Sequence, residues 1–265
     1  MTSPPAAREM GSRCVREQDM KLQTRVNGLF ARWVTGLVVT FAVLSSAHAD
    51  PPPASQPTTV HIVIAGDATS ADNTGWGGAF AKLICGDAGC ANQSRLGQSS
   101  GAFLSAGCWK RCLSLHPDYV LIQFGHNDEL GHAGSGPVDP NTVYKDNLRH
   151  YVDDARAAGV KPILITPMAR RQFGPDGKIH SSLQPYAEVV RDVANEKHVP
   201  LVDLHARSIE LYEKLGPDGC RDLSYKKRDG TFDVAHLSAE GAKAIAPLVV
   251  DELKKAAPEL ATYLK

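Results

Sequence analysis

The chain has 265 residues, of which 29 are basic and 29 acidic, and 43% are hydrophobic. This length suits one α/β domain with a full core. The balanced charge gives no support for nucleic-acid binding, which depends on an excess of cations.

The N-terminal 49 residues have the pattern of a secretory signal behind an upstream extension. Residues 21–32 form a basic lead-in, residues 33–46 are an apolar run too short to span a bilayer, and Ala47-His48-Ala49 is a small-x-small cleavage sequence. We expect cleavage near Ala49, a secreted or periplasmic mature chain, and no membrane span in it. A retained membrane anchor is the alternative.

Residues 50–59 contain four prolines and are expected to form an extended linker. The predicted organisation is therefore a signal with its extension over 1–49, a linker over 50–59, and one domain over 60–265. The leader holds six of the basic and three of the acidic residues, which leaves 23 basic against 26 acidic side chains. This small negative balance argues against nucleic acid as a partner.

Five cysteines remain beyond the leader, and export to an oxidising compartment favours disulfides. Cys85–Cys90 and Cys108–Cys112 are the simplest pairs and would leave Cys220 free, although spacing does not settle the connectivity. A zinc site is the alternative. It is disfavoured because neither a Cys-x-x-Cys pair nor a paired His spacing accompanies these residues.

Apolar runs and helical patterns alternate from residue 60 onward. Continuous apolar runs suit strands buried on both faces of a parallel sheet, and they lie at 60–65, 119–124, 162–166 and 200–204, with a weaker strand at 91–96. Helices are predicted at 76–83, 142–158, 183–197, 208–215 and 239–255. The alternation predicts an α/β fold with a central, doubly wound parallel sheet.

Polar motifs follow three of these strands. Gly66-Asp67-Ala68, Gly125-His126-Asn127 and Thr166-Pro167 each come directly after a strand, so they should converge at the carboxyl edge of the sheet. Asp233-Val234-Ala235-His236 precedes the last helix. Each motif alone is weak, because Gly-Asp is most often a turn and Asp-x-x-His could be a cap or half of a metal site. Their order and placement together are much more specific.

The combined motifs are the parts of a serine esterase that lacks its serine. Asn127 can hold an oxyanion, His236 can act as general base, and Asp233 can orient the imidazole. Residue 68, where a nucleophilic hydroxyl is expected, is alanine.

The chain resembles the SGNH (GDSL-like) hydrolase superfamily and, within it, the rhamnogalacturonan acetylesterase family of carbohydrate esterases. The similarity extends over residues 60–250 and is carried by four blocks: Gly66-Asp67-Ala68-Thr69, residues 97–103, Phe124-Gly125-His126-Asn127-Asp128 and residues 233–242. The stretch 166–173, Thr-Pro-Met-Ala-Arg-Arg-Gln-Phe, resembles the acetylesterase branch. The resemblance implies a flavodoxin-like three-layer α/β/α sandwich.

The resemblance also implies roles for particular residues. Position 68 would be the nucleophile, and its N–H would form the oxyanion hole with Gly97 N–H and the Asn127 amide. His236 would take the proton, and Asp233 would hold the imidazole in the right tautomer. The implied reaction removes acetyl groups from a plant cell-wall polysaccharide, pectic rhamnogalacturonan above all, and requires neither metal nor organic cofactor.

Ala68 departs from the family pattern, and a methyl group cannot attack an acyl carbon. Thr69 and Ser70 are expected to point away from His236, so we predict that this chain is inactive. A deliberate substitution and a natural pseudoenzyme that binds acetylated sugar both explain Ala68. An SGNH acylhydrolase acting on another ester is a further alternative.

Three residues are candidates for substrate binding. Trp76 could stack on a sugar ring, although a tryptophan near a helix is more often part of the core. Arg170 and Arg171 could meet a uronate carboxylate, and a structural salt bridge is the alternative for them.

Overall fold

The structure is a computed structural model, and it describes residues 59–131 and 138–265. The predicted signal and upstream extension lie outside these residues, as does the predicted linker up to residue 58. Those assignments therefore remain predictions.

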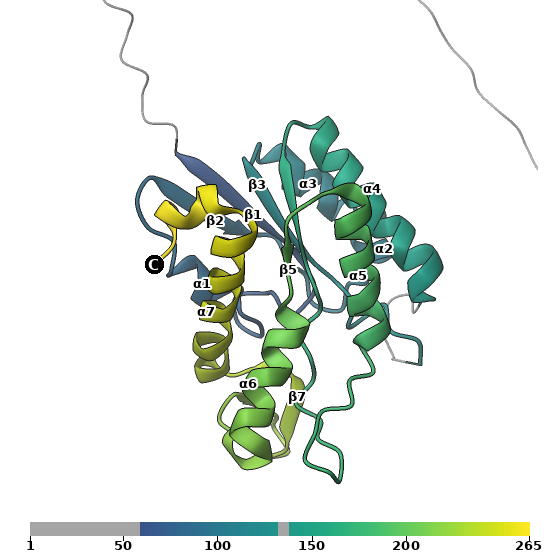
Figure 1. The fold of residues 1–265 in the computed structure, drawn as a ribbon, viewed down its shortest axis with the longest axis vertical. Helices are drawn as coiled ribbons and strands as arrows, with labels where there is room; N and C mark the ends of the chain where they lie inside the picture. Colours follow the sequence, from purple (N-terminus) through teal and green to yellow (C-terminus); the bar gives the residue numbers. More distant parts are fainter. Residues whose placement is uncertain (1–58, 132–137) are drawn as a thin grey trace, which may run out of the picture. The chain divides into compact units, whose positions relative to one another are not determined.

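Five parallel strands form the central sheet (Figure 1), in the order β2-β1-β3-β4-β5. They are β1 (Val60–Gly66), β2 (Ala88–Asn92), β3 (Tyr119–Gln123), β4 (Lys161–Ile165) and β5 (Leu201–Val202). Every neighbouring pair is parallel. This order is that of the flavodoxin-like doubly wound sheet, so the predicted fold class is confirmed.

The continuous apolar runs place side chains in two cores, one on each face of the sheet. Successive residues of a strand point to opposite faces. In β1, Ile62 and Ile64 therefore join one core, while Val63 and Ala65 join the other. Both faces need helices to cover them, which is why these strands read as unbroken apolar runs.

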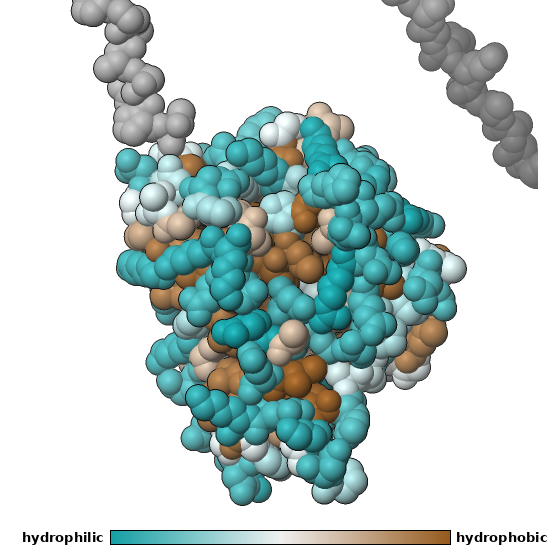
Figure 2. All heavy atoms as spheres, in the orientation of Figure 1, coloured by the Kyte–Doolittle hydropathy of each residue, from teal (hydrophilic) through white to brown (hydrophobic). Residues whose placement is uncertain are grey.

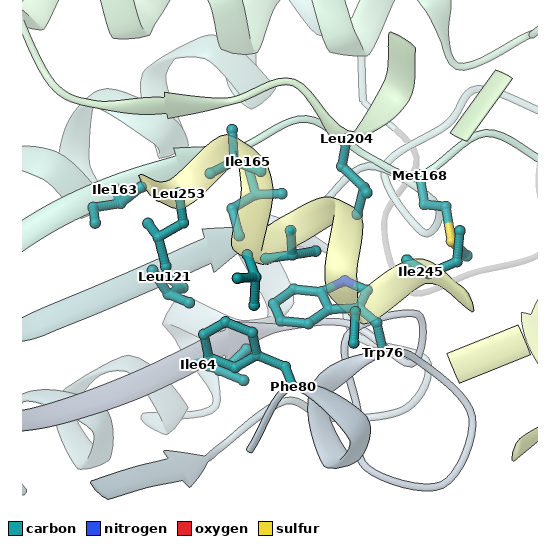
Figure 3. Close-up of a cluster of buried hydrophobic side chains, with 14 of the residues drawn as sticks. Ile64, Trp76, Phe80, Leu121, Ile163, Ile165, Met168, Leu204, Ile245 and Leu253 are labelled. Carbon is teal, nitrogen blue, oxygen red and sulfur yellow. The ribbon is translucent and has the colours of Figure 1, made fainter. Parts of the chain in front are cut away.

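Helices cover the two faces in separate groups (Figure 1). The core that contains Ile64 is covered by α1 (Gly77–Ala81), α6 (Leu204–Gly219), α7 (Ala239–Ala256) and the terminal 3-10 turn η2 (Pro258–Tyr263). Figure 3 shows Trp76 and Phe80 packed there against strand and α7 side chains. The opposite core is covered by α2 (Ser100–Ser105), α3 (Cys108–Ser114), α4 (Lys145–Ala157) and α5 (Gln184–Lys197).

Several elements differ from the sequence prediction. Helices α2 and α3 are too short to show a clear helical period, and the start of the predicted helix 142–158 is a π-helical turn, η1 (Pro140–Tyr144). The edge strand β2 begins earlier than the predicted 91–96. The Asp-x-x-His motif lies in a strand, β7 (Phe232–Leu237), which pairs antiparallel with β6 (Ser224–Lys226) in a separate two-stranded sheet.

The predicted disulfides are wrong for this structure, because all five cysteines in its described part are unbridged. Cys108 and Cys112 lie one turn apart on α3. That spacing holds Cβ atoms about 5–6 Å apart, farther than the roughly 3.5–4.5 Å that a disulfide spans. Cys90 is on β2, and burial raises its pKa to about 12, so it is a protonated thiol at neutral pH.

Hydrophilic residues surround separate apolar areas on the face of the described residues that Figure 2 shows. Within the two described ranges, no helix is both long and apolar enough to cross a membrane. The same residues contain no cluster of three His, Cys, Asp or Glu side chains suited to a metal ion.

Gly241, in the first turn of α7, allows this helix to pack closely against the Leu223 carbonyl. A Cβ at this position would clash with the Leu223 carbonyl, which belongs to the backbone and cannot rotate away. We expect Gly241→Ala to lower the free energy of unfolding by about 1–3 kcal/mol, as overpacking does. Urea denaturation measures it. Gly89→Ala is the matched control, because a Cβ there meets nothing within 4 Å, and equal losses in both variants would contradict the packing argument.

Candidate active site

Residues from five separate segments line one cavity of about 210 Å³ at the carboxyl edge of the sheet. Four loops that follow strands contribute, and the fifth segment is β7. The lining residues are Asp67, Ala68, Thr69, Leu96, Gly97, His126, Asn127, Arg170, Ala235 and His236. The structure thus brings residue 68 together with the proposed base, His236, and with Gly97 and Asn127, which carry the other two proposed oxyanion donors.

The Asp233–His236 pair has the geometry of an oriented base. Asp233 Oδ2 lies 3.1 Å from His236 Nδ1, and Asp233 Oδ1 accepts the backbone N–H groups of Ala235 and His236 at 2.8 Å each. Partial burial works against the charge of Asp233, but these hydrogen bonds outweigh it and hold the pKa of Asp233 at about 2. The carboxylate is therefore ionised at neutral pH. With Nδ1 engaged by the carboxylate, Nε2 is the nitrogen left to accept a proton.

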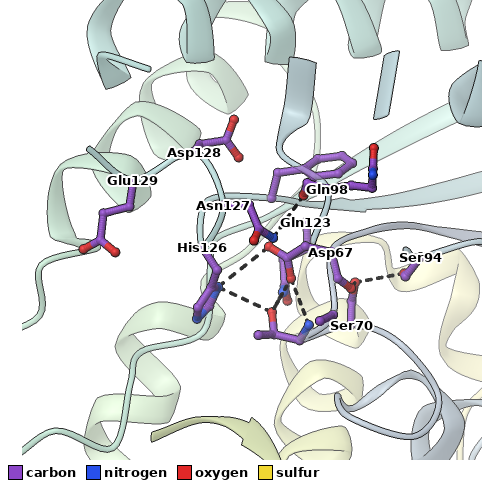
Figure 4. Close-up of polar contacts among 12 residues, drawn as sticks. Asp67, Ser70, Ser94, Gln98, Gln123, His126, Asn127, Asp128 and Glu129 are labelled. Carbon is purple, nitrogen blue, oxygen red and sulfur yellow. Dashed lines mark hydrogen bonds and ion pairs between the residues drawn. The ribbon is translucent and has the colours of Figure 1, made fainter. Parts of the chain in front are cut away.

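The hydroxyls next to residue 68 are committed elsewhere. Thr69 Oγ1 donates to Asp67 Oδ1 and accepts from Gln123 Nε2, both at 2.7 Å. Ser70 Oγ donates to the Asp67 carbonyl at 3.1 Å and lies 2.9 Å from Ser94 Oγ. Both residues are buried. Neither hydroxyl can replace a nucleophile at position 68 without breaking this network, part of which is drawn in Figure 4.

Trp76 corrects one prediction, because it is fully buried and cannot stack on a sugar. Its indole Nε1 donates to Gln123 Oε1 at 2.8 Å, and Gln123 in turn donates to Thr69. Trp76 therefore supports the floor of the cavity from the core. Trp109 is also buried and donates to Asp154.

Asp67 is a fully buried carboxyl at one end of this network. Burial raises its pKa, although hydrogen bonds from the Thr69 N–H and hydroxyl oppose the change. Its second oxygen lies 3.8 Å from His126 Nδ1. His126 is itself buried and thus contacts the Gly-Asp turn. It directly precedes Asn127 in the chain.

The two loops that carry the proposed oxyanion donors Gly97 and Asn127 are hydrogen-bonded to each other. Asn127 Nδ2 donates to the Gln98 carbonyl at 3.1 Å, so the loop after β3 contacts the loop that contains Gly97. Asp128 accepts the Ser100 N–H at 2.9 Å and also the Ser100 hydroxyl, at the start of α2. Gly97 has φ 71°, a conformation that favours glycine. These contacts fix where the Gly97 and Asn127 donors stand before any ligand binds.

Sequence reasoning missed Asp128, Ser100 and Gln123 as parts of the site. Asp128 follows the recognised Gly-His-Asn motif, but its partner Ser100 is 28 residues away. Gln123 lies inside an apolar strand, where a single buried amide is a weak signal that it has a polar partner.

The two arginines after β4 have different positions. Arg170 lines the cavity, and it also forms a salt bridge with Glu129 at 2.6 Å, which is the alternative considered for it. Its role in substrate binding stays a prediction. Arg171 is only 6% exposed and its guanidinium is occupied by Ser224, Tyr212 and backbone carbonyls. The prediction that Arg171 meets a substrate carboxylate is therefore wrong, because no face of it is open to a ligand.

A second Ser–His pair lies away from the cavity-lining residues. His205 Nε2 is 2.9 Å from Ser181 Oγ, and burial lowers the pKa of His205 to about 4. The Leu183 N–H also donates to this hydroxyl, at the turn that leads into α5. The pair therefore has a local structural function.

Comparison with known proteins places this chain in a family. Residues 63–244 match the model of the GDSL-like lipase/acylhydrolase family. The chain belongs to this family. Rhamnogalacturonan acetylesterase RhgT of Bacillus subtilis (strain 168) is 29% identical over 222 residues, which cover 77% of this chain and 94% of that protein.

Two solved structures are also similar to this GDSL-like chain. Protein YxiM from Bacillus subtilis has a TM-score of 0.64 at 26% identity, with 75% of this chain and 57% of that one covered. An acetylxylan esterase from Geobacillus stearothermophilus has a TM-score of 0.58 at 19% identity, with 73% and 94% covered. At 19% identity, the similarity to the acetylxylan esterase shows only that the two chains share a fold.

Asp128 gives a pH dependence that can be measured. Burial raises its pKa to about 7 against hydrogen bonds from Ser100, so the folded chain holds this proton more tightly than the unfolded chain. Its contribution to stability is therefore complete below about pH 4 and is lost as the pH rises through 7. We expect the free energy of unfolding of the unaltered chain, relative to that of Asp128→Asn, to fall by up to roughly 4 kcal/mol as the pH rises from below 4 to above 7. Denaturant unfolding at several pH values measures it.

Subtracting the two curves cancels groups that titrate in both proteins, including His205, whose lowered pKa acts in the opposite sense. A difference that stays constant from pH 4 to pH 8 would contradict the assignment of this proton to Asp128.

Proposed function

We propose that this chain has the scaffold of a carbohydrate O-acetylesterase acting on acetylated plant cell-wall polysaccharide, rhamnogalacturonan first, and that Ala68 stops its turnover. The observation that carries the proposal is the cavity where Ala68, Gly97, Asn127 and His236 meet. A relative named as a rhamnogalacturonan acetylesterase, similar over nearly its full length, supports the substrate class. The carbohydrate would be the binding partner of the mature chain.

With a hydroxyl at residue 68, the geometry suits acyl transfer to a serine. His236 Nε2 would take the hydroxyl proton as the oxygen attacks the acetyl carbon, and Asp233 would stabilise the imidazolium that forms. The carbonyl oxygen would become an oxyanion held by the N–H groups of residues 68 and 97 and by the Asn127 amide. The sugar oxygen then leaves with the proton from His236. Water next attacks the carbonyl carbon of the acetyl-serine while His236 takes its proton. His236 returns that proton to the serine oxygen as acetate leaves.

The small cavity favours acetyl over longer acyl groups. Its volume is about 210 Å³, and Leu96 and Arg170 stand beside the catalytic residues. A long acyl chain would need an extended apolar groove, so we rank other SGNH acylhydrolase activities behind acetylesterase. Export, proposed from the pattern of residues 1–49, would bring the chain to a substrate outside the cell.

Ala68 itself favours a second function, the binding of acetylated carbohydrate without cleavage. The substitution removes the attacking oxygen, yet it keeps the backbone donor at residue 68 and leaves Gly97, Asn127 and the Asp233–His236 pair in place. A scaffold of this kind retains its contacts to the ester and loses the covalent step.

Restoring the serine tests the esterase proposal. We expect Ala68→Ser to hydrolyse aryl acetates and to release acetate from acetylated rhamnogalacturonan, with a gain in kcat on the order of a million-fold over the unaltered chain. Ala68→Gly should remain inactive, because it changes the side chain without adding a hydroxyl. His236→Ala in the serine background should abolish the gain.

Each other outcome has a defined meaning. Equal activity with Ala and Ser at residue 68 would place the nucleophile elsewhere, and Ser181→Ala would then test the pair formed with His205. Absence of acetate release from acetylated pectin, xylan and aryl acetates by the serine form would reject the esterase scaffold.

Calorimetry separates the binding function from a disabled enzyme. If binding of the ester is the function, the unaltered chain should bind an acetylated oligosaccharide more tightly than its deacetylated form by tenfold or more, about 1.4 kcal/mol. Asn127→Ala should reduce the preference, because it removes a donor to the acetyl carbonyl. Equal affinity for both oligosaccharides would contradict recognition of the acetyl group.

A further inference from the structure

Arg171 is a buried cation whose surroundings point to a role in the reaction without contact to substrate. It lies in the loop after β4, and only 6% of the residue is exposed. Its guanidinium donates to uncharged oxygens: Ser224 Oγ at 2.8 Å, Tyr212 Oη at 3.3 Å, and the carbonyls of Asp233 at 3.0 Å and His236 at 2.6 Å. A buried charge is costly unless its donors are satisfied, and here the acceptors come from α6, from β6 and from β7, the strand that carries the proposed base.

Contacts of Arg171 with β7 come from both its side chain and its backbone. One guanidinium nitrogen, Nη2, donates to the carbonyls of Asp233 and His236, the two members of the proposed dyad. The Arg171 N–H donates to the Val234 carbonyl between them at 2.8 Å. One residue therefore holds three carbonyls within a four-residue segment of β7.

The position of β7 depends on such contacts because it lies outside the central sheet. In the described structure, β7 pairs only with β6, and this two-stranded sheet is separate from the five-stranded one. Residue 68, by contrast, follows β1 in the central sheet. The ladders alone therefore do not set how His236 stands relative to residue 68.

Two contacts make this connection. The Leu237 N–H donates to the Thr74 carbonyl at 2.9 Å, and Thr74 Oγ1 donates to the Ala68 carbonyl at 2.7 Å. That chain of contacts reaches the end of β7 from the loop after β1. Arg171 reaches the middle of β7 from the loop after β4. Together they fix the strand at two points.

We propose that Arg171 is a positioning residue that aligns the Asp233–His236 dyad with residue 68. Its catalytic meaning rests on the proposed esterase function, but the alignment itself is a property of the chain with Ala68. The planar guanidinium suits this task because its five donors spread over several acceptors in fixed directions. A lysine ammonium places three donors at one point and cannot reach the same set.

Kinetics in the Ala68→Ser background test the proposal. We expect Arg171→Met to lower kcat by on the order of 100-fold, as small misplacements of reacting groups do, while KM for an aryl acetate stays within about twofold. Arg171→Lys should have a kcat between that of Arg171→Met and that of the Ala68→Ser background. Arg191→Met is the matched control, since Arg191 is a second bound arginine, paired with Asp203 at 2.8 Å away from the cavity lining. It should lower stability and leave kcat within about twofold.

Proton NMR of the unaltered chain gives a readout that needs no activity. A proton on His236 Nδ1 bound to the Asp233 carboxylate should give a strongly downfield resonance, assigned by its loss in His236→Gln. We expect this resonance to disappear or move upfield in Arg171→Met and to persist in Arg191→Met. If the serine form proves inactive, the esterase proposal fails while this spectrum still decides the role of Arg171.

An Arg171→Met chain that folds, keeps the downfield resonance and retains kcat within about threefold of its background would overturn the proposal. Should Arg171→Met fail to fold, Arg171→Lys and Ser224→Ala replace it, because each keeps part of the contact set. Unchanged resonance and kcat in both of those variants would likewise overturn it. Loss of kcat with the resonance shifted supports it.

Discussion

The parallel pairing of β1 with β3 is the constraint on which the site depends. Its register ends with Gly66 opposite Gln123, and the Asp67 N–H continues the ladder to the Gln123 carbonyl at 3.3 Å. Both strands therefore leave the sheet at the same level, so that the turn holding residue 68 and the loop holding Asn127 emerge side by side. A shift in this register would separate the two loops and reverse which side chains face each core.

Buried polar side chains then make these loops rigid. Asp67, Thr69, Gln123 and Trp76 form a connected set beneath the cavity, and Asp128 ties the loop after β3 to the start of α2. Leaving any of these groups unpaired would cost about 1–3 kcal/mol, which favours one arrangement over alternatives. The same burial raises the pKa of Asp67 and Asp128, so the rigidity of the site is coupled to pH.

Under the proposed function, Ala68 would separate binding from chemistry in this protein. The side chain of residue 68 lines the cavity, whereas the backbone of its turn is held by Thr74 and by the contacts of Thr69. Changing serine to alanine there removes an attacking atom without removing a structural contact that the described residues depend on. The family scaffold can therefore persist with the proposed oxyanion donors and the proposed base in place.

The sequence by itself determined the layered α/β fold and the segments that meet at the site. Unbroken apolar runs such as 119–123 require helices on both faces, and motifs directly after strands must converge at one edge of a parallel sheet. Only the tertiary structure decided what lies beneath and behind the site: Trp76 is core, Arg171 holds β7, and Asp128 bonds Ser100. These roles depend on partners up to 65 residues away in the chain, as for Arg171 and His236. Local pattern cannot reveal them, because burial and hydrogen bonding are set by which segments pack together and not by neighbours in sequence.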